Sequence, residues 1–268
     1  MRFFPPYLFD LRILILGFFL TSFPGTLAAG TVLFSVSDPQ GDALGDGVYA
    51  LPSTLTDRSV LDLRTFTASD NAGKLELQLA FASVQNPERA PNGFSFALID
   101  VYLNTERGGI EDLGITGFHT PPGRGWRYHL RVNGWNALLE TAKNAPASAR
   151  VSSKVAVQVD GANIVLSTQL PADAYRYWAF VSLYDPLSKD GVKQVSGEAS
   201  AFNLSSNLQD APSVLDVLSP TSQVSYYTSR EVEPLNEPKL EFNPLLYSLF
   251  AGLVLSLIAT IWGLFRRP

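Results

Sequence analysis

Alternating apolar and polar residues recur along the middle of the chain, and this pattern restricts the available folds more than any other feature of the sequence. Residues Lys74–Phe81, Trp126–Val132 and Val155–Val159 place apolar side chains at every second position. A period of two residues is typical of a β-strand with one buried face. The run Phe94–Leu103 is apolar on both faces, which is typical of a strand in the centre of a sheet. We therefore predict a fold built from β-strands.

Further strand candidates lie between turn-forming clusters such as Asn71-Ala72-Gly73 and Asp160-Gly161. These candidates are Val32–Val36, Leu61–Phe66, Ile164–Leu170 and Trp178–Leu183. About eight strands without regular helical crossovers predict an all-β fold, an antiparallel β-sandwich, over residues 30–205. We expect one short helix, over Trp135–Lys143.

The N-terminal residues have the pattern of a secretory signal peptide. Arg2 and Arg12 precede the short apolar run Ile13–Leu20, and small residues follow at positions 28–30. This order predicts a signal peptide over residues 1–29, cleaved near its end. The alternative is an uncleaved signal anchor, but the apolar core is shorter than the roughly 18 residues of a spanning helix.

The C-terminal residues predict a membrane anchor. Residues 245–265 form a run of 21 residues without a charge, about 31 Å long as a helix, which matches the hydrocarbon thickness of a bilayer. Arg266 and Arg267 follow at once, and positive charge marks the cytoplasmic side. We therefore expect a single-pass protein of the cell membrane with its domain outside and residues 266–268 as a cytoplasmic tail. The alternative is a sorting tail that is cleaved after export.

A polar, proline-rich segment precedes this anchor. Residues 206–244 carry prolines at positions 212, 220, 234, 238 and 244. Proline-rich polar segments form extended spacers. We therefore expect these residues to be an extended stalk between the sandwich and the membrane.

The charge and the rare residue types exclude several classes of function. Residues 30–265 hold 16 Lys and Arg against 24 Asp and Glu, a net charge of −8. Such a surface repels phosphate backbones, which argues against nucleic acid as a partner and leaves neutral polysaccharides open. The chain has no cysteine and two histidines, His119 and His129, and it lacks a Gly-x-Ser-x-Gly motif. We therefore expect a non-catalytic protein.

An acidic, glycine-rich loop follows the first expected strand. Asp38, Asp42 and Asp46 lie four residues apart in the segment Asp38-Pro39-Gln40-Gly41-Asp42-Ala43-Leu44-Gly45-Asp46. Flexible loops rich in oxygen ligands suit Ca²⁺, so these three aspartates are candidate metal ligands. The alternative is an ordinary turn in which the carboxylates accept hydrogen bonds from backbone amides. No other cofactor is indicated.

Several spaced motifs resemble the glucodextranase C-terminal-domain-like family. They are the acidic loop, Asn86-Pro87, Asn92-Gly93-Phe94-Ser95, Ile99–Leu103, Trp126-Arg127-Tyr128, Val132–Trp135, Ala179–Asp185 and Val214–Leu218. The resemblance covers roughly residues 31–228. The resemblance implies a β-sandwich accessory module that binds carbohydrate or a cell-surface polymer. This sequence departs from the family at Ala43, where a second aspartate is usual, and at Glu88, where tryptophan is usual.

Aromatic side chains are the expected ligand contacts of such a module, because flat rings suit the C–H faces of a sugar. We expect Trp135 and Trp126 to contact the ligand, with Asp100 and Asn104 as polar partners; the alternative for both tryptophans is a place in the core. Three other functions stay open: a structural envelope or S-layer-associated role, a glycoside hydrolase, and a haem carrier with the two histidines as ligands.

Overall fold

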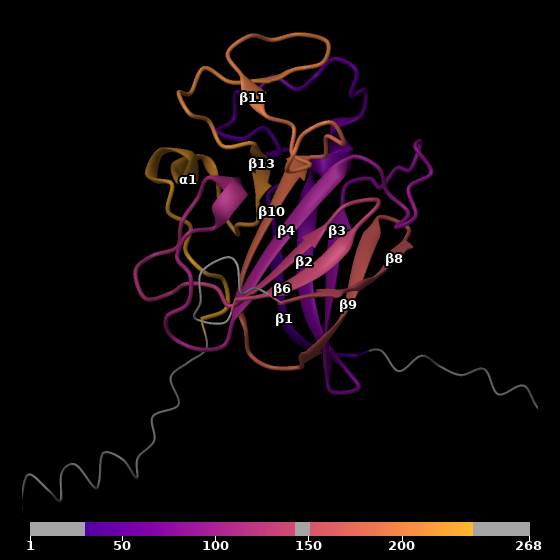
Figure 1. Ribbon diagram of the computed structural model, residues 1–268, viewed down its shortest axis with the longest axis vertical. Coiled ribbons are helices and arrows are strands. Elements are labelled where there is room, and N and C mark those ends of the chain that lie inside the picture. Colours follow the sequence, from indigo (N-terminus) through magenta and orange to yellow (C-terminus); the bar gives the residue numbers. More distant parts are fainter. Residues whose placement is uncertain (1–29, 143–150, 238–268) are drawn as a thin grey trace, which may run out of the picture.

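The computed structural model of the chain describes residues 30–142 and 151–237, which form two stacked β-sheets (Figure 1). The predicted signal peptide 1–29, membrane helix 245–265 and cytoplasmic tail 266–268 lie outside the described residues. Within the ranges that the structure describes, no helix is long and apolar enough to cross a membrane.

The first sheet has five antiparallel strands in the order β1-β2-β3-β9-β8. Their bounds are Thr31–Ser37 (β1), Leu63–Asn71 (β2), Lys74–Phe81 (β3), Asn163–Pro171 (β9) and Ala156–Asp160 (β8). Strand β3 shows how the alternation defines the two faces. Leu75, Leu77 and Leu79 are fully buried, whereas the residues between them are exposed or half-buried.

The second sheet has six antiparallel strands in the order β13-β10-β4-β5-β6-β7. Their bounds are Val214–Val217 (β13), Arg176–Leu183 (β10), Ala97–Asn104 (β4), Tyr128–Val132 (β5), Ala137–Thr141 (β6) and Val151–Lys154 (β7). Every residue of β4 and β10 is buried, since these central strands are covered on both faces. A short parallel pair, β11 (Val195–Ser196) with β12 (Leu204–Ser205), lies beyond one end of the sheets (Figure 1).

The hydrophobic core lies between the two sheets. Tyr177 of β10 stacks on Phe34 of β1 with ring centroids 5.3 Å apart, and it lies 5.1 Å from the ring of Phe66 on β2. Each large side chain buried in this way stabilises the fold by about 1.5–3 kcal/mol. Aromatic contacts of this kind join the inner faces of the two sheets.

The all-β prediction is confirmed, and each of the eight expected strands overlaps a strand of the structure. The predicted helix over Trp135–Lys143 is wrong, because Ala137–Thr141 form β6 and pair with β5. The local sequence has good helix formers, but the exposed edge of β5 offers backbone partners that override this propensity.

The predicted stalk is also wrong for its described part, residues 206–237. Strand β13 pairs with β10 inside the second sheet, and helix α1 (Val224–Ser229) follows it. Tyr227 of α1 is buried, and its hydroxyl donates to the carbonyl of Val214 at 3.0 Å. Prolines 212, 220 and 234 lie in the connections outside β13 and α1, so they do not prevent these elements from forming. Residues 238–244 lie outside the described range.

Candidate functional site

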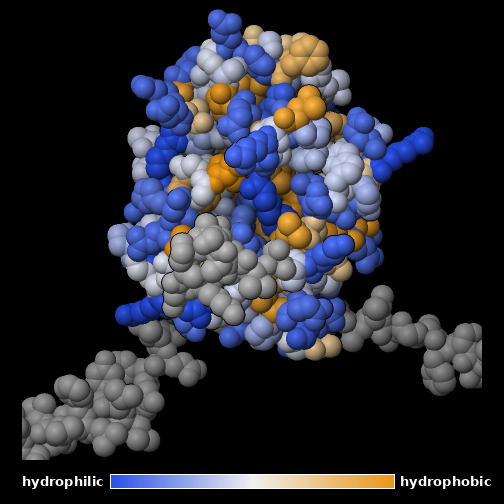
Figure 2. Space-filling model, viewed as in Figure 1, coloured by the Kyte–Doolittle hydropathy of each residue, from blue (hydrophilic) through white to orange (hydrophobic). Residues whose placement is uncertain are grey.

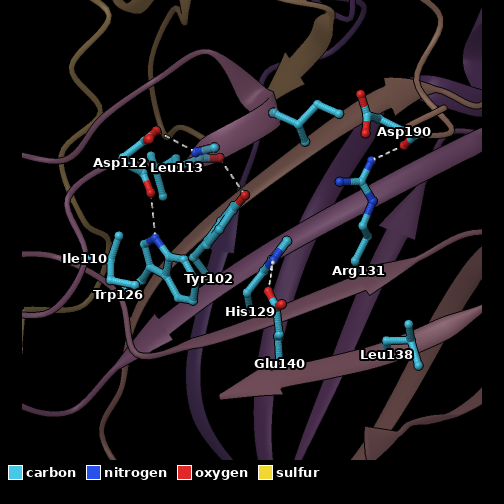
Figure 3. Close-up of a pocket in the computed structure, with 12 residues that line it drawn as sticks. Tyr102, Ile110, Asp112, Leu113, Trp126, His129, Arg131, Leu138, Glu140 and Asp190 are labelled. Carbon is cyan, nitrogen blue, oxygen red and sulfur yellow. Dashed lines mark hydrogen bonds and ion pairs between the residues drawn. The ribbon is translucent and has the colours of Figure 1, made fainter. Parts of the chain in front are cut away.

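A cavity of about 410 Å³ opens on the second sheet, over β4, β5 and β6 (Figure 3). In the register of the three strands, Tyr102, His129 and Glu140 lie side by side, and all three line the cavity. The neighbouring residues Val101 and Leu130 alternate to the opposite face and belong to the core. The cavity therefore lies on the outer face of the sheet, and its size is typical of small-molecule sites, about 300–1,000 Å³.

The face around this cavity carries hydrophobic residues next to strongly hydrophilic ones (Figure 2). Its lining combines aromatic and aliphatic side chains with a histidine, an arginine and carboxylates. An apolar surface with a few polar groups is the usual composition of a site that binds a small molecule.

Two aromatic residues at the border of the cavity, Trp126 and Tyr102, belong to the core, and only 2% and 1% of them are exposed. Trp126 and Tyr102 lie 5.3 Å apart in an edge-to-face arrangement. Both side chains are fixed by hydrogen bonds to one loop. Trp126 Nε1 donates to the backbone carbonyl of Asp112 at 2.8 Å. The hydroxyl of Tyr102 donates to the backbone carbonyl of Leu113 at 2.6 Å. Gly109 is needed at the start of this loop, since its φ is +105° and a Cβ would lie 2.6 Å from the carbonyl oxygen of Trp126.

His129 lies in the middle of the cavity lining, beside Glu140 (Figure 3), and it also contacts the buried Asp100. Its Nε2 lies 2.7 Å from Oδ1 of Asp100 and its Nδ1 lies 3.7 Å from Oε2 of Glu140. The ring stacks on Tyr102 with centroids 4.0 Å apart. Burial alone would lower the pKa of His129, but the hydrogen bonds to Asp100 and Glu140 raise it above its ordinary value. The cavity floor therefore favours a protonated histidine with a carboxylate on each side.

Arg131 completes the polar part of the cavity. Its Nη2 donates to the backbone carbonyl of Asp190 at 2.6 Å, and its Nη1 lies 3.8 Å from Oδ1 of Asp100. The arginine is still partly exposed, as is the carboxylate of Glu140. A guanidinium offers several donors and a carboxylate several acceptors, so the pair can bind neighbouring hydroxyl groups of one ligand.

The structure places one of the four predicted ligand contacts, Trp126, in the lining of this cavity and a second, Asp100, behind His129. Trp126 lines the cavity, although only 2% of the residue is exposed. Asp100 is buried and reaches the cavity through His129. Asn104 is buried elsewhere: its Nδ2 donates to the carbonyls of Gly108 and Gly125, and its Oδ1 accepts from the amide of Glu106. Asn104 therefore holds the loops after β4 together.

Trp135, the first predicted contact, does not line the cavity. It lies in the turn between β5 and β6, where Asn133 Oδ1 accepts from its amide at 2.8 Å. Its ring stacks on Tyr184 with centroids 5.0 Å apart, and 38% of the residue is exposed. Gly134 precedes it because a Cβ there would collide with the carbonyl oxygen of Phe94. Trp135 and Tyr184 thus form a separate aromatic surface.

His129, Arg131 and Glu140 were not among the predicted sugar contacts, and His129 was named only in the haem alternative. His129 and Arg131 alternate along β5, so a polar strand face was visible in the sequence. Glu140 lies in the segment that was predicted to be a helix. Only the pairing of β5 with β6 places it beside His129, so the sequence alone did not indicate it.

The acidic loop after β1 forms a second cluster. Asp38 and Asp42 come together with Asp216 of β13, and ligand atoms of the three lie within 4.8 Å of one another. Asp46 is not part of this cluster, and its Oδ1 instead accepts from the amide of Val48 at 3.1 Å. Asp216 was not among the predicted metal ligands, although a lone aspartate inside the apolar segment Val214–Leu218 was a signal.

The two sheets and the lined cavity define a β-sandwich binding module. The family described as the C-terminal binding module, SLH-like, of glucodextranase matches residues 33–232, which are 200 of the 268 residues, and the chain belongs to this family. This match confirms the resemblance found in the motifs. A comparison with curated proteins found no match to the chain.

Proposed function

We propose that this domain binds a neutral polysaccharide, an α-glucan or a cell-wall glycan, in the cavity over β4, β5 and β6. The observation that carries the proposal is the meeting of two partly exposed charged residues, Arg131 and Glu140, with Trp126 and Tyr102 at the border of one cavity. Membership in a family of glucodextranase binding modules supports the same ligand class.

The chemistry of a pyranose ring fits this cavity. Its C–H faces pack against aromatic rings, and its hydroxyl groups pair with charged donors and acceptors. The net charge of −8 over residues 30–265 disfavours a polyanionic ligand and nucleic acid, so the proposed partner is an uncharged glycan.

Affinity electrophoresis of the full-length protein through gels containing α-glucan or wall glycan tests this proposal. Glu140→Gln and Arg131→Gln each remove a charged hydrogen bond to the ligand, which corresponds to roughly 10- to 100-fold weaker retention. Glu76→Gln is the matched control, because Glu76 lies on β3 of the other sheet, away from the cavity. Its carboxylate accepts hydrogen bonds from Ser167 and Asn71. Unchanged retention of both cavity variants would contradict binding at the cavity.

A second surface for the same function is the stacked pair of Trp135 and Tyr184. Trp135 stacks on Tyr184 and is partly exposed, so its ring offers a flat surface on which a sugar ring can pack. Trp135→Ala should then weaken retention while β5 and β6 keep their register. If Trp135→Ala abolishes retention and the cavity variants do not change it, the platform is the ligand site.

We further propose that the domain is a non-catalytic module held at the outer face of the cell membrane. The uncharged run 245–265 followed by Arg266 and Arg267 supports the anchor. Carboxylates that a hydrolase would need have structural partners: Glu106 pairs with Arg127 at 2.8 Å, and Glu111 accepts from the amide of Gly123. Tethering raises the effective concentration of weak sites near the cell.

Two measurements separate the proposed functions from their alternatives. Hydrolysis of α-glucans or chromogenic glycosides that disappears on substitution of one Asp or Glu would refute the non-catalytic assignment. Lack of retention on any α-glucan or wall preparation would refute sugar binding, and a structural role in the envelope would replace it.

A further inference from the structure

Three carboxylates from distant parts of the chain meet beside the acidic loop. Asp38 follows β1, Asp42 lies in the loop, and Asp216 lies on β13 at the edge of the other sheet. Their ligand atoms lie within 4.8 Å of one another. Two oxygens on opposite sides of one Ca²⁺ ion lie about 4.6–5.2 Å apart, since each bond is about 2.3–2.6 Å long. The cluster therefore has the dimensions of a calcium site.

Backbone amides fix one oxygen of two of these carboxylates and leave the other without a partner. The amide of Ser219 donates to Asp38 Oδ1 at 2.6 Å, and the amide of Leu63 donates to Asp216 Oδ2 at 2.8 Å. Asp38 Oδ2 and Asp216 Oδ1 are buried without a hydrogen-bond partner among the described residues. Only 7% of Asp38 and 0% of Asp216 are exposed. Such oxygens are rare in folded proteins unless an ion or a water satisfies them.

The two carboxylate oxygens of Asp42 are also buried without a hydrogen-bond partner among the described residues. The loop that carries Asp42 is held by Gln223, whose Nε2 donates to the carbonyls of Asp42 at 2.6 Å and Gly45 at 2.9 Å. The position of Asp42 is therefore set before any ligand binds.

The charge of Arg64 acts on Asp42, but Arg64 shares this charge with Asp62. Arg64 forms its ion pair with Asp62, at 2.7 Å. Three carboxylates packed together at this depth need a positive charge to stay ionised.

We propose that Asp38, Asp42 and Asp216 bind one Ca²⁺ ion that joins the end of β1 to β13. Oxygen-only ligands favour a hard cation, and Ca²⁺ tolerates the irregular geometry of a loop better than Mg²⁺, which needs a near-ideal octahedron. Asp38 follows a strand of the first sheet and Asp216 belongs to the second, so the ion fastens the two sheets at this edge. The site is distinct from the proposed sugar cavity, whose lining residues it does not share.

Thermal unfolding of the full-length protein, with CaCl2 and then with EGTA, tests the proposal. Extracellular calcium modules have dissociation constants of about 10⁻⁴–10⁻³ M, so 10 mM CaCl2 should raise the melting temperature by about 3–10 °C. Asp216→Asn and Asp42→Asn should each abolish most of this shift. In EGTA, the melting temperature of each variant should lie within a few degrees of that of the wild type. Two variants are used because the buried Asp216 is the more sensitive position for folding.

Asp46→Asn is the matched control, since Asp46 lies in the same loop but outside the cluster. It should keep the full calcium-dependent shift. Calorimetric titration of CaCl2 should show one site per chain in the wild type and in Asp46→Asn. An unchanged melting temperature without calorimetric binding would overturn the proposal. An equal shift with MgCl2 alone, or loss of the shift in Asp46→Asn but not in Asp42→Asn, would also overturn it.

Discussion

Ending the chain at Ser205, where the alternation predicted the sandwich to stop, should prevent the domain from folding. This truncation removes β13 and α1, and with them a strand of the second sheet. It also removes Gln223, whose side chain joins the acidic loop to β13 by donating to the carbonyl of Leu215 at 3.0 Å. A chain of residues 30–237 retains all of these contacts.

The size of the loss follows from the side chains that leave the core. Six residues with 3% exposure or less are removed: Val214, Leu215, Val217, Leu218, Tyr227 and Val232. At about 1.5–3 kcal/mol each, their burial contributes roughly 9–18 kcal/mol. This range matches or exceeds the whole stability of an ordinary domain, about 5–15 kcal/mol.

Urea unfolding followed by circular dichroism and tryptophan fluorescence measures this difference. Residues 30–237 should unfold in one cooperative transition, and residues 30–205 should show no transition at all. Cooperative unfolding of residues 30–205 with a free energy within about 2 kcal/mol of the longer chain would refute the assignment of β13 and α1 to the core.

Three further predictions concern backbone geometry, pH and topology. Gly134→Ala should destabilise the fold by about 2–4 kcal/mol because the new Cβ collides with the carbonyl of Phe94, and urea unfolding should detect it; a loss below 0.5 kcal/mol would contradict this packing. The pKa of His129 is raised in the folded protein, so protonated His129 stabilises the fold. This contribution is complete below the ordinary histidine pKa of about 6.5, and it is lost as the pH rises through the raised pKa of the folded state. Melting temperatures from pH 6 to 9 should therefore fall more steeply for the wild type than for His129→Gln, and parallel profiles would contradict the carboxylate contacts of His129. Protease added to intact spheroplasts should remove the domain if the predicted export and anchor are right, whereas protection until lysis would reverse the predicted orientation.

The strands were predictable because the alternation that defines them is local. In β3, the fully buried Leu75, Leu77 and Leu79 can be read directly from the sequence, and the wholly buried β4 was visible as an apolar run. The family motifs were also local enough to be recognised. Local patterns of this kind do not depend on which strand lies next to which.

Features that depend on strand pairing were missed. Ala137–Thr141 contains good helix formers, and only its pairing with β5 makes it a strand. Strand β13 has four residues among prolines, too short for an alternation to be recognised, and its role comes from the edge of β10. The site shares this limit, since Glu140 meets His129 through register and Asp216 meets Asp38 across 178 positions of sequence.

A crystal structure of residues 30–237 with a maltooligosaccharide or a wall oligosaccharide would show whether a glycan binds in the cavity. We expect sugar density in the cavity over β4, β5 and β6, next to Trp126 and hydrogen-bonded to Arg131 and Glu140. Density confined to the surface of Trp135 and Tyr184, or an empty cavity in crystals grown at a sugar concentration that saturates binding in solution, would contradict this expectation.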